Sequence, residues 1–575
     1  MFGYFTLVLH THLPYVVGHG RWPHGMDWLN EAVSECYIPL LNVFNELRNE
    51  GVNFKVTINI SPILAEQLAS REFSDEFLQY LDMRIKLAEE DEIEFKRTGR
   101  KNLAEVAKFW KEFYLGIKRS FIDAYHTDLL SAFRSLQDSG HIEIITCAAT
   151  HAYLPLLALD TSVQAQIKLA VKTHEKYFGR KPEGIWLPEC AYRPGYKWRI
   201  PVELEQNLTP VEYERKGVEE FLSENDLKFF FIDTATLRGG KTIGVYIERF
   251  EGLRKLWEQF ESQVKYRPEE EKSPYEIYLV GSGKPEKRPV AVLTRDPKTG
   301  LQVWSGEWGY PGDAWYLDFH KKKFPSGLRY WRVTNPKADL ADKLEYELEK
   351  VEERLEENSS HFVDLITATL KEHYDKTGKP GVLTAPYDTE LFGHWWFEGP
   401  RFLKKVFQKL NNSEFVKPAT ASEAIEKSNP TTVVSLPEGS WGEGGYHYIW
   451  LNKDTEWTWR HIYPNEFKMR EFAKKFHNSN DEKLIFMLKQ LARELVLLQS
   501  SDWQFLISTI SARDYAEMRV LLHHENFTRI AEIIERYTRT GELKFEDWNF
   551  VVECAQRDKV FDEIDPKWWA EVEFP

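Results

Sequence analysis

The sequence contains few cysteines and no long apolar run. Its four cysteines are Cys36, Cys147, Cys190 and Cys554, and no two of them form a CxxC pair. This spacing supports neither a disulfide framework nor a cysteine-ligated zinc site. No run of about 18 apolar residues occurs, so we expect no transmembrane helix. The opening residues MFGYFTLVLHTHLP lack the basic leader of a signal peptide. A reducing cytoplasm is therefore the expected location.

The chain also lacks an excess of basic residues. Its 575 residues include 75 Lys and Arg against 90 Asp and Glu, which gives a net charge of −15. Nucleic acid and anionic membranes are therefore not expected as main partners, because phosphate binding requires a basic face. The hydrophobic fraction of 42% excludes disorder and allows a large core.

Tryptophan, by contrast, is abundant. The chain has 20 of these residues. The indole is costly to leave in water, and a surplus often lines sites that stack on flat partners such as sugar rings. Packing in an ordinary core is the alternative for each one. Clusters occur at Trp22 and Trp28, at Trp304, Trp308 and Trp315, at Trp395 and Trp396, at Trp441 and Trp450, and at Trp503.

Short apolar runs bounded by polar or turn residues predict six buried strands, and helical patterns separate them. Strands that alternate with helices indicate βαβ units, a parallel sheet and an α/β fold. The predicted strands are Phe5–Leu9, Phe54–Ile60, Ile142–Thr146, Gly184–Leu187, Phe229–Ile232 and Val382–Ala385.

The spacing of these strands predicts the domain organisation. Residues 1–428 are expected to form one catalytic domain, with a mostly helical insertion at about 62–140 and an irregular excursion at about 239–290. A turn-rich segment then precedes an amphipathic stripe of leucines between Leu484 and Leu498. We expect residues 429–575 to form a C-terminal helical domain packed at the active-site face.

Titratable side chains follow four of the predicted strands. In a parallel α/β barrel the carboxyl ends of all strands open on one face, which holds the active site. We therefore expect one pocket to contain His10, His12, His151, Glu189, Asp388 and His394.

Two of these residues are carboxylates that only the fold can bring together. A pair of carboxylates is the minimum apparatus for cleaving a glycosidic bond. The alternative is that Glu189 and Asp388 cap helices or bind arginines. The histidines allow a different chemistry, because an HxH pair with a distant His and Asp could ligate zinc, as in a metal-dependent carbohydrate deacetylase. Each histidine could also be purely structural.

Five ordered motifs resemble glycoside hydrolase family 57 and, within it, the α-1,4-glucan branching enzymes. They are HTHLP (His10–Pro14), THAYLP (Thr150–Pro155), WLPECAY (Trp186–Tyr192), APYDTELFGHWWFEG (Ala385–Gly399) and QSSDWQF (Gln499–Phe505). The resemblance implies an incomplete (β/α)7 barrel with a helical insertion and a C-terminal α-helical domain. It also implies an enzyme that uses no metal or cofactor.

The resemblance further implies roles for individual residues. Glu189 would be the nucleophile and Asp388 the general acid/base of a retaining double displacement, in which the two carboxyl groups stand about 5–5.5 Å apart. Branching enzymes of the family carry a tyrosine on a mobile loop, for which Tyr246 is the candidate here, with Tyr266 and Tyr275 following it. The expected substrate-binding residues are His10, His12, Trp28, His151, Trp304, Trp396, Trp441, Trp450, Asp502 and Trp503.

The implied activity is that of a 1,4-α-glucan branching enzyme, which cleaves an α-1,4-glucan and transfers it to a 6-hydroxyl in glycogen-type synthesis. Transfer to water would instead make the chain an α-amylase, and transfer to a 4-hydroxyl would make it a 4-α-glucanotransferase. A glucan-binding protein without catalysis is a further alternative, against which the intact pair Glu189 and Asp388 argues. The expected partner is an α-1,4-glucan, and the expected assembly is a monomer or a simple homo-oligomer.

Overall fold

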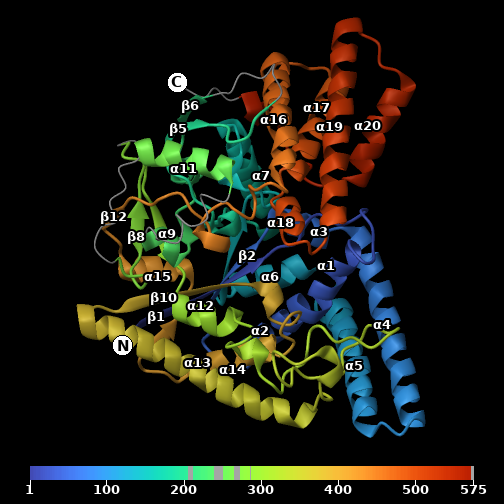
Figure 1. Cartoon of the computed structure of the whole chain (residues 1–575), viewed down its shortest axis with the longest axis vertical. Coiled ribbons are helices and arrows are strands. Elements are labelled where there is room, and N and C mark those ends of the chain that lie inside the picture. The colour runs from blue at the N-terminus through green and yellow to red at the C-terminus, as the bar shows by residue number, and fades with distance from the viewer. Residues whose placement is uncertain (205–211, 239–249, 264–271, 285–286, 571–575) are drawn as a thin grey trace.

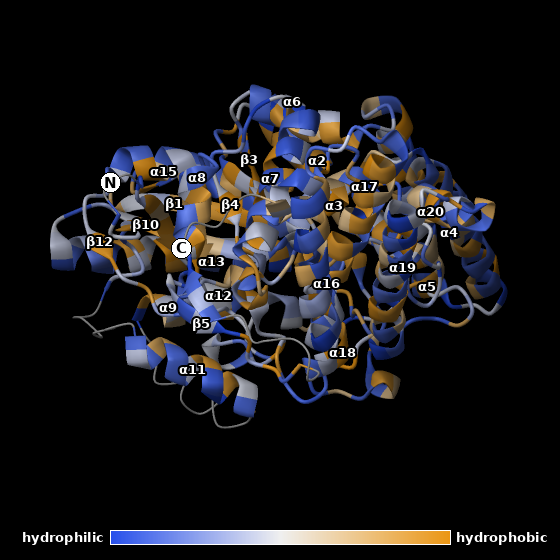
Figure 2. Ribbon diagram, turned by 90° about the horizontal axis from the view of Figure 1, so that it is seen from above, coloured by the Kyte–Doolittle hydropathy of each residue, from blue (hydrophilic) through white to orange (hydrophobic). Residues whose placement is uncertain are grey.

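Among the described residues, seven parallel strands pair into a ring. Figure 1 shows helices around the labelled strands of this ring. The computed structural model describes residues 1–204, 212–238, 250–263, 272–284 and 287–570. Figure 2 shows that the central strands are mostly hydrophobic, whereas the surrounding helices also carry hydrophilic residues. This is the pattern expected of a parallel sheet that is covered on its outer side.

The ring consists of two groups of hydrogen-bonded strands, and a single β-bridge closes each of the two gaps between the groups. Strands β10, β1, β2, β3 and β4 pair side by side, and β7 pairs with β9. Single parallel bridges, Gly184 to Phe229 and Arg295 to Thr384, close the two gaps. The predicted incomplete (β/α)7 barrel is therefore confirmed. Its strands are β1 (Gly3–Thr11), β2 (Val56–Ile60), β3 (Ile142–Cys147), β4 (Ile185–Trp186), β7 (Phe229–Ile232), β9 (Val290–Thr294) and β10 (Gly381–Asp388).

Strand β9 is the one that the sequence analysis did not predict. All five of its residues are buried, but they follow directly on the charged, proline-rich end of the expected excursion at 239–290. That excursion is not irregular throughout, because it contains α11 (Glu251–Gln263) and β8 (Tyr278–Val280). Helical spacing of Leu253, Leu256 and Phe260 gives α11 a buried face. β8 pairs antiparallel with β9 and parallel with β12 (Val433–Val434).

Helices connect the strands of the ring and cover it. Residues 62–140 contain two long antiparallel helices, α4 and α5, which lie side by side at the lower right of Figure 1. The connecting helices are α1 (Met26–Ala32), α2 (Ile38–Asn49), α3 (Pro62–Leu68), α4 (Arg71–Arg97), α5 (Lys101–Arg119), α6 (Leu129–Asp138), α7 (Asp160–Phe178), α8 (Val218–Glu224), α9 (Thr234–Arg238), α12 (Pro297–Trp304), α13 (Leu348–Thr377), α14 (Gly399–Asn411) and α15 (Ala421–Ser428). Like β8 and β12, the short strands β5 (Tyr196–Arg199), β6 (Glu212–Arg215) and β11 (Val416–Pro418) lie outside the ring.

The C-terminal part of the chain is helical, and its long helices stand together at the upper right of Figure 1. The predicted leucine stripe lies on one helix and faces inward, with Leu491 and Leu495 fully buried. These elements are α16 (Glu456–Phe476), α17 (Glu482–Leu498), α18 (Asp502–Ser508), α19 (Arg513–Thr540) and α20 (Phe545–Arg557).

Buried polar contacts connect this helical part to the segment that follows β1. His19 Nε2 lies 2.5 Å from a carboxylate oxygen of Asp558, and both side chains are almost fully buried. The Tyr515 hydroxyl donates to the carbonyl of His19 at 2.9 Å. On the helical side, His523 Nδ1 lies 2.7 Å from Glu494. Burial lowers the pKa of His19 and His523 to about 3, so both are neutral partners, and Arg557 supplies the positive charge beside Asp558 at 2.8 Å. Each buried polar group in this contact is thus hydrogen-bonded, which orients the two parts.

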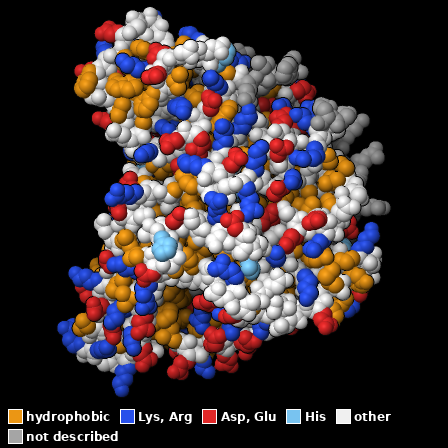
Figure 3. Space-filling model, turned by 180° about the vertical axis from the view of Figure 1, so that it is seen from behind, with side chains coloured by type: hydrophobic (Ala, Val, Ile, Leu, Met, Phe, Trp, Pro, Cys, Tyr) orange, Lys and Arg blue, Asp and Glu red, His pale blue; other side chains and the backbone are white. Residues whose placement is uncertain are grey.

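Two features of the surface and core bear on the sequence predictions. The four cysteines are buried and free, and no helix among the described residues is long and apolar enough to cross a membrane. Figure 3 shows acidic and basic side chains interspersed over the face that it presents. Many acidic and basic side chains of the protein form ion pairs, such as Lys404 with Glu46 at 2.8 Å.

His174 of α7 provides a test of how burial affects stability. Neither ring nitrogen has a hydrogen-bond partner within the described chain, and burial, together with nearby Arg180, lowers the pKa of His174 to about 3. The unfolded chain binds this proton near pH 6.5, so stability decreases as the pH falls from 6.5 towards 3. Relative to pH 7.5, this one group should cost about 2 kcal/mol of unfolding free energy at pH 5.

We expect His174→Leu to raise the free energy of unfolding and to remove this pH dependence. Denaturant unfolding of the variant and the parent at pH 7.5 and pH 5 measures both effects. His174→Gln keeps a buried polar group but cannot titrate, so it should flatten the pH dependence without the gain at pH 7.5. A difference between parent and variant that does not grow on acidification would contradict this assignment.

Candidate functional site

The carboxyl ends of the ring strands bring the predicted catalytic residues to one rim. His10 is the next-to-last residue of β1, and His12 directly follows that strand. Asp388 is the last residue of β10, and β10 and β1 pair in register so that Asp388 lies opposite His10. Glu189 lies in the short helical turn Pro188–Cys190 that follows β4. Both carboxyl-bearing residues are partly exposed, so a ligand can reach them.

Glu189 is held in an unusual conformation by Trp441. Its φ of 61° lies in the left-handed region, which side-chain-bearing residues rarely adopt. The Trp441 indole Nε1–H donates to Glu189 Oε2 at 2.6 Å, and the Trp441 backbone N–H donates to the Glu189 carbonyl at 3.0 Å. The adjoining residues Tyr192 and Gly439 form an antiparallel bridge. These contacts hold the carboxylate in one position, as a reacting group requires.

Both carboxyl groups bind protons more tightly than ordinary carboxyls. Burial raises the pKa of Glu189 to about 8, the Trp441 hydrogen bond opposes this, and the charges of Asp388 and Asp502 add to it. Burial raises the pKa of Asp388 to about 7, against the opposing charges of Arg295 and His12. Two carboxyls that repel each other lose their protons in separate steps. The pair therefore holds a single proton across part of the neutral range, which acid–base chemistry requires.

Two histidines behind the carboxyls form a hydrogen-bonded relay. Asn59 Nδ2 donates to the carbonyl of Ile145, so its Oδ1 faces His10 and accepts from His10 Nδ1 at 2.6 Å. His10 Nε2 then accepts from His151 Nε2 at 3.0 Å, and His151 Nδ1 accepts from the Ser501 hydroxyl at 2.8 Å. Burial lowers the pKa of both His10 and His151 well below the ordinary value. Both rings are thus neutral, each as one tautomer.

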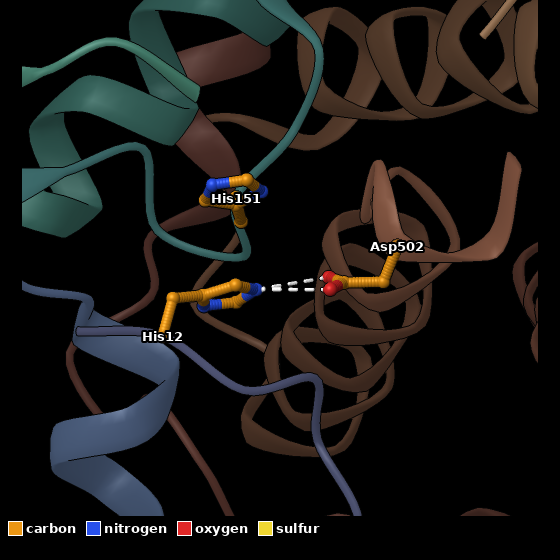
Figure 4. A group of neighbouring side chains, drawn as sticks. All are labelled: His12, His151 and Asp502. Carbon is orange, nitrogen blue, oxygen red and sulfur yellow. Dashed lines mark hydrogen bonds and ion pairs between the residues drawn. The ribbon is translucent and has the colours of Figure 1, made fainter. Parts of the chain in front are cut away.

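His12 joins the rim of the barrel to the C-terminal helices. Its Nε2 lies 3.0 and 3.1 Å from the two carboxylate oxygens of Asp502, at the start of α18 (Figure 4). Its ring stacks on that of His151, with centroids 4.0 Å apart. Ala152 and Ser500 form an antiparallel bridge beside this contact. The segment 499–503 therefore completes one wall of the site.

His12, His151 and Asp502 also place their ligand atoms within 4.8 Å of one another, which is close enough for a metal ion. Both nitrogens of His151 are already engaged, by His10 and by Ser501. The rings of His12 and His151 lie face to face, 9° from parallel, whereas ligating imidazoles direct their lone pairs at one point. A cation would have to displace one of the existing hydrogen bonds, so these three side chains fit their present hydrogen-bonded arrangement better than they fit a metal site.

Three of the predicted tryptophans are partly exposed, and one of them, Trp441, bonds to Glu189. Trp441 contacts Trp304 edge to face at 6.5 Å. Trp28, on α1, contacts Tyr515 of α19 at 5.4 Å. All three rings retain exposed surface, so each can offer a face to a flat ligand.

The other three predicted tryptophans lie in the interior of the protein. Trp396 is 1% exposed and packs on Phe402 at 4.7 Å. Trp450 is 1% exposed and stacks on Tyr153 at 4.3 Å. Trp503 is fully buried, with the Arg519 guanidinium over its ring. Core side chains cover these three rings, so the structure shows no exposed face of Trp396, Trp450 or Trp503 for a substrate. They support the site from behind.

His394 pairs with two carboxylates other than the predicted catalytic pair. Its Nδ1 lies 2.8 Å from Glu35 and its Nε2 lies 3.9 Å from Glu31. Glu31 lies on α1 and Glu35 lies in the π-helical segment Val33–Tyr37 that follows it, so His394 connects the segment after β10 to these helices. The candidate loop residues Tyr246 and Tyr266 lie outside the described residues.

Sequence reasoning missed several residues that the structure adds to the site. Arg295 follows β9, ion-pairs with Asp233 at 3.5 Å and lies over the Trp441 ring at 5.6 Å. Trp186 stacks on His10 at 4.9 Å. The rule that titratable residues follow strands would have identified Arg295 had strand β9 been predicted. Asn59, by contrast, is an interior residue of β2 without any sequence signal.

Comparison with known proteins gives similarity over nearly the whole chain. The family model described as Glycosyl hydrolase family 57 matches residues 6–437, and the model described as 1,4-alpha-glucan branching enzyme, C-terminal, matches residues 461–569. The 1,4-alpha-glucan branching enzyme TK1436 of Thermococcus kodakarensis is 41% identical over 561 residues, which cover 98% of this chain and 78% of the relative.

Solved structures show the same similarity. A GH57-type branching enzyme from Pyrococcus horikoshii matches with a TM-score of 0.87 and 40% identity, over 100% of this chain and 98% of that chain. The α-amylase AmyC from Thermotoga maritima matches with a TM-score of 0.80 and 30% identity, over 100% of both chains. The overall architecture is therefore shared by proteins named for two different activities.

The relay predicts the protonation of the two histidines. In protein labelled with ¹⁵N-histidine, we expect His10 to carry its proton on Nδ1 and His151 on Nε2, and both to stay neutral from pH 8 to pH 5. The nitrogen chemical shifts report both properties. Ser501→Ala removes the donor to His151 Nδ1, so it should shift that resonance most. A titration of either ring with a midpoint near 6.5 would contradict the relay.

Proposed function

This chain belongs to glycosyl hydrolase family 57, and we propose that it acts as a 1,4-α-glucan branching enzyme. The observation that carries the proposal is the two-part match, in which the family model covers the barrel and a branching-enzyme model covers residues 461–569. The barrel supplies Glu189 and Asp388, and the helical part supplies Asp502 and the wall around it.

The first step cleaves an α-1,4 bond. A carboxylate oxygen of Glu189 attacks the anomeric carbon as the bond from that carbon to the leaving oxygen breaks, and the proton of Asp388 passes to the leaving oxygen. The Trp441 N–H favours the ionised form of Glu189. Burial favours the protonated form of Asp388. Because burial raises the pKa of both carboxyls, the two roles rest on this hydrogen bond and on the resemblance of the motifs around Glu189 and Asp388 to those of the family.

The second step transfers the glucosyl group. Asp388, now ionised, removes the proton of an acceptor hydroxyl, whose oxygen bonds to the anomeric carbon while the bond to Glu189 breaks. Two inversions retain the α configuration. A 6-hydroxyl as acceptor gives a branch, whereas water gives hydrolysis. The similarity to AmyC makes hydrolysis the second candidate function.

The remaining polar groups bind the sugar. His10, His12 and His151 form one face of the cleavage position. His10 is hydrogen-bonded to Asn59 and His151, and His12 is hydrogen-bonded to Asp502. The ring nitrogens of His10 and His151 already bond to Asn59, to each other and to Ser501. A sugar hydroxyl, which both donates and accepts, would therefore exchange with one of these partners at a neutral imidazole, which has one donor and one acceptor. We propose that Trp28, Trp304 and Trp441 stack on the neighbouring glucose units.

We also propose that the enzyme works in the cytoplasm in glycogen-type polysaccharide synthesis. Four buried free cysteines suit a reducing compartment, where thiols persist. A monomer or simple homo-oligomer remains the expected assembly.

The product formed from amylose decides between the two functions. We expect new α-1,6 linkages in the proton NMR spectrum and reduced iodine staining, with few new reducing ends. Glu189→Gln should abolish this activity, whereas the exposed matched control Glu183→Gln should retain it. Reducing ends without branches would establish an amylase instead. Loss of activity with EDTA, restored by zinc, would instead revive the metal-dependent alternative.

Trp441 should determine the acid limb of the pH profile. Trp441→Phe keeps an aromatic ring but removes the donor to Glu189, so the pKa of Glu189 should rise further and the acid limb should move to higher pH. Turnover should also fall by roughly 10- to 100-fold, as expected for losing a hydrogen bond to a charged group. The control is Trp308→Phe at an exposed tryptophan. An unchanged acid limb would refute the role of the indole N–H.

A further inference from the structure

A row of four indoles leads from Glu189 to the protein surface. Trp186 contacts Trp441 at 4.9 Å, Trp441 contacts Trp304 at 6.5 Å, and Trp304 contacts Trp395 at 6.4 Å, with ring planes 61–80° apart. Exposure increases along the row. Trp186 is fully buried, Trp441 and Trp304 are partly exposed, and Trp395 is 44% exposed. The row therefore connects the nucleophile to an open indole.

The turn after β10 presents Trp395 outward while it buries the adjacent Trp396. Gly393 has a φ of 120°, and a Cβ there would lie 1.9 Å from the carbonyl oxygen of Glu35, so no other residue fits. Its N–H donates to the Trp396 carbonyl at 2.8 Å, and the Trp395 N–H donates to the Glu390 carbonyl at 3.3 Å. This backbone sends two neighbouring indoles in opposite directions. It corrects the choice of Trp396 and assigns the exposed position to Trp395.

A buried charge cluster supports the turn from below. The Arg329 guanidinium donates to the carbonyl of His394 at 3.0 Å and to Glu35 at 3.0 Å, and both charged side chains are about 95% buried. His394 Nδ1 also lies 2.8 Å from Glu35. The residue before Trp395 is therefore anchored through both its backbone and its side chain. Such anchoring limits the conformational entropy that Trp395 would lose on binding a ligand.

We propose that Trp395 is an outer stacking site for the α-glucan chain, beyond the subsites that flank the cleaved bond. An anchored, exposed indole has an unpartnered apolar face, and the flat face of a glucose unit is a ligand that covers such a face. The ring contact with Trp304 makes Trp395 continuous with the cleavage site. Because it is the outermost of the four rings, Trp395 contacts only chains long enough to extend past Trp304. This inference rests on the proposed action on α-glucans.

The test compares chain lengths in steady-state kinetics. We expect Trp395→Ala to raise KM for amylose by roughly 3- to 10-fold, as expected for the loss of one stacking contact. Turnover of amylose should stay within about two-fold of the parent, because no group at the reacting atoms changes. For maltooligosaccharides too short to reach Trp395, both constants should stay unchanged. Trp395→Tyr should restore most of the affinity for amylose.

Two controls make the result decisive. Phe545→Ala, at a 74% exposed aromatic of α20, tests for a general effect of surface truncation and should leave KM unchanged. Thermal unfolding verifies that each variant is folded. An unchanged KM for amylose, or an equal effect on short and long chains, would overturn the outer site. If the parent protein has no activity on any α-glucan, the proposed function fails instead, and affinity electrophoresis in amylose gels still shows whether Trp395→Ala weakens glucan binding.

Discussion

The closure of seven parallel strands into a ring is the constraint on which the site depends. Because all the strands run in one direction, their carboxyl ends share one rim, and residues distant in sequence meet there. Closure requires close approach at two joints. At one of them a Cβ on Gly184 would lie 2.2 Å from the ring of Phe229, so only glycine lets β4 reach β7. At the other, Arg295 and Thr384 pair by a single bridge. Glu189 and Asp388 each lie a few residues beyond one of these joints.

The electrostatics of the site suit a substrate without charge. A neutral sugar supplies no counter-ion, so the protein itself must provide the groups that stabilise charge during the reaction. Burial raises the pKa of Glu189 and Asp388 and keeps His10 and His151 neutral. Carboxyls with a raised pKa bind more protons in the folded than in the unfolded state, so their contribution to stability decreases as the pH rises from about 4.5 to 8. The raised pKa values that keep a proton on these carboxyls therefore lower the free energy of unfolding at higher pH.

The helical part of the chain completes the site and also orients it. The segment 499–503 supplies Asp502 to His12 and the Ser501 hydroxyl to His151. A separate buried contact, between His19 and Asp558, holds the segment after β1 against the same helices. Two connections on either side of one rim resist rotation of the helices relative to the barrel. A displacement of about 1 Å in such a site is enough to reduce catalysis, so a fixed orientation of these helices matters for the reaction.

The sequence by itself determined the α/β class, six of the seven strands and the two carboxylates, because hydrophobic runs and the residues that follow them are local features. It did not reveal β9, whose apolar run adjoins a charged, proline-rich stretch, and so it did not reveal Arg295. Only the tertiary structure decided between Trp395 and Trp396, which are adjacent and chemically identical. The backbone at Gly393 buries one and exposes the other. A side chain's partners depend on what packs around it, and distant parts of the chain supply that packing.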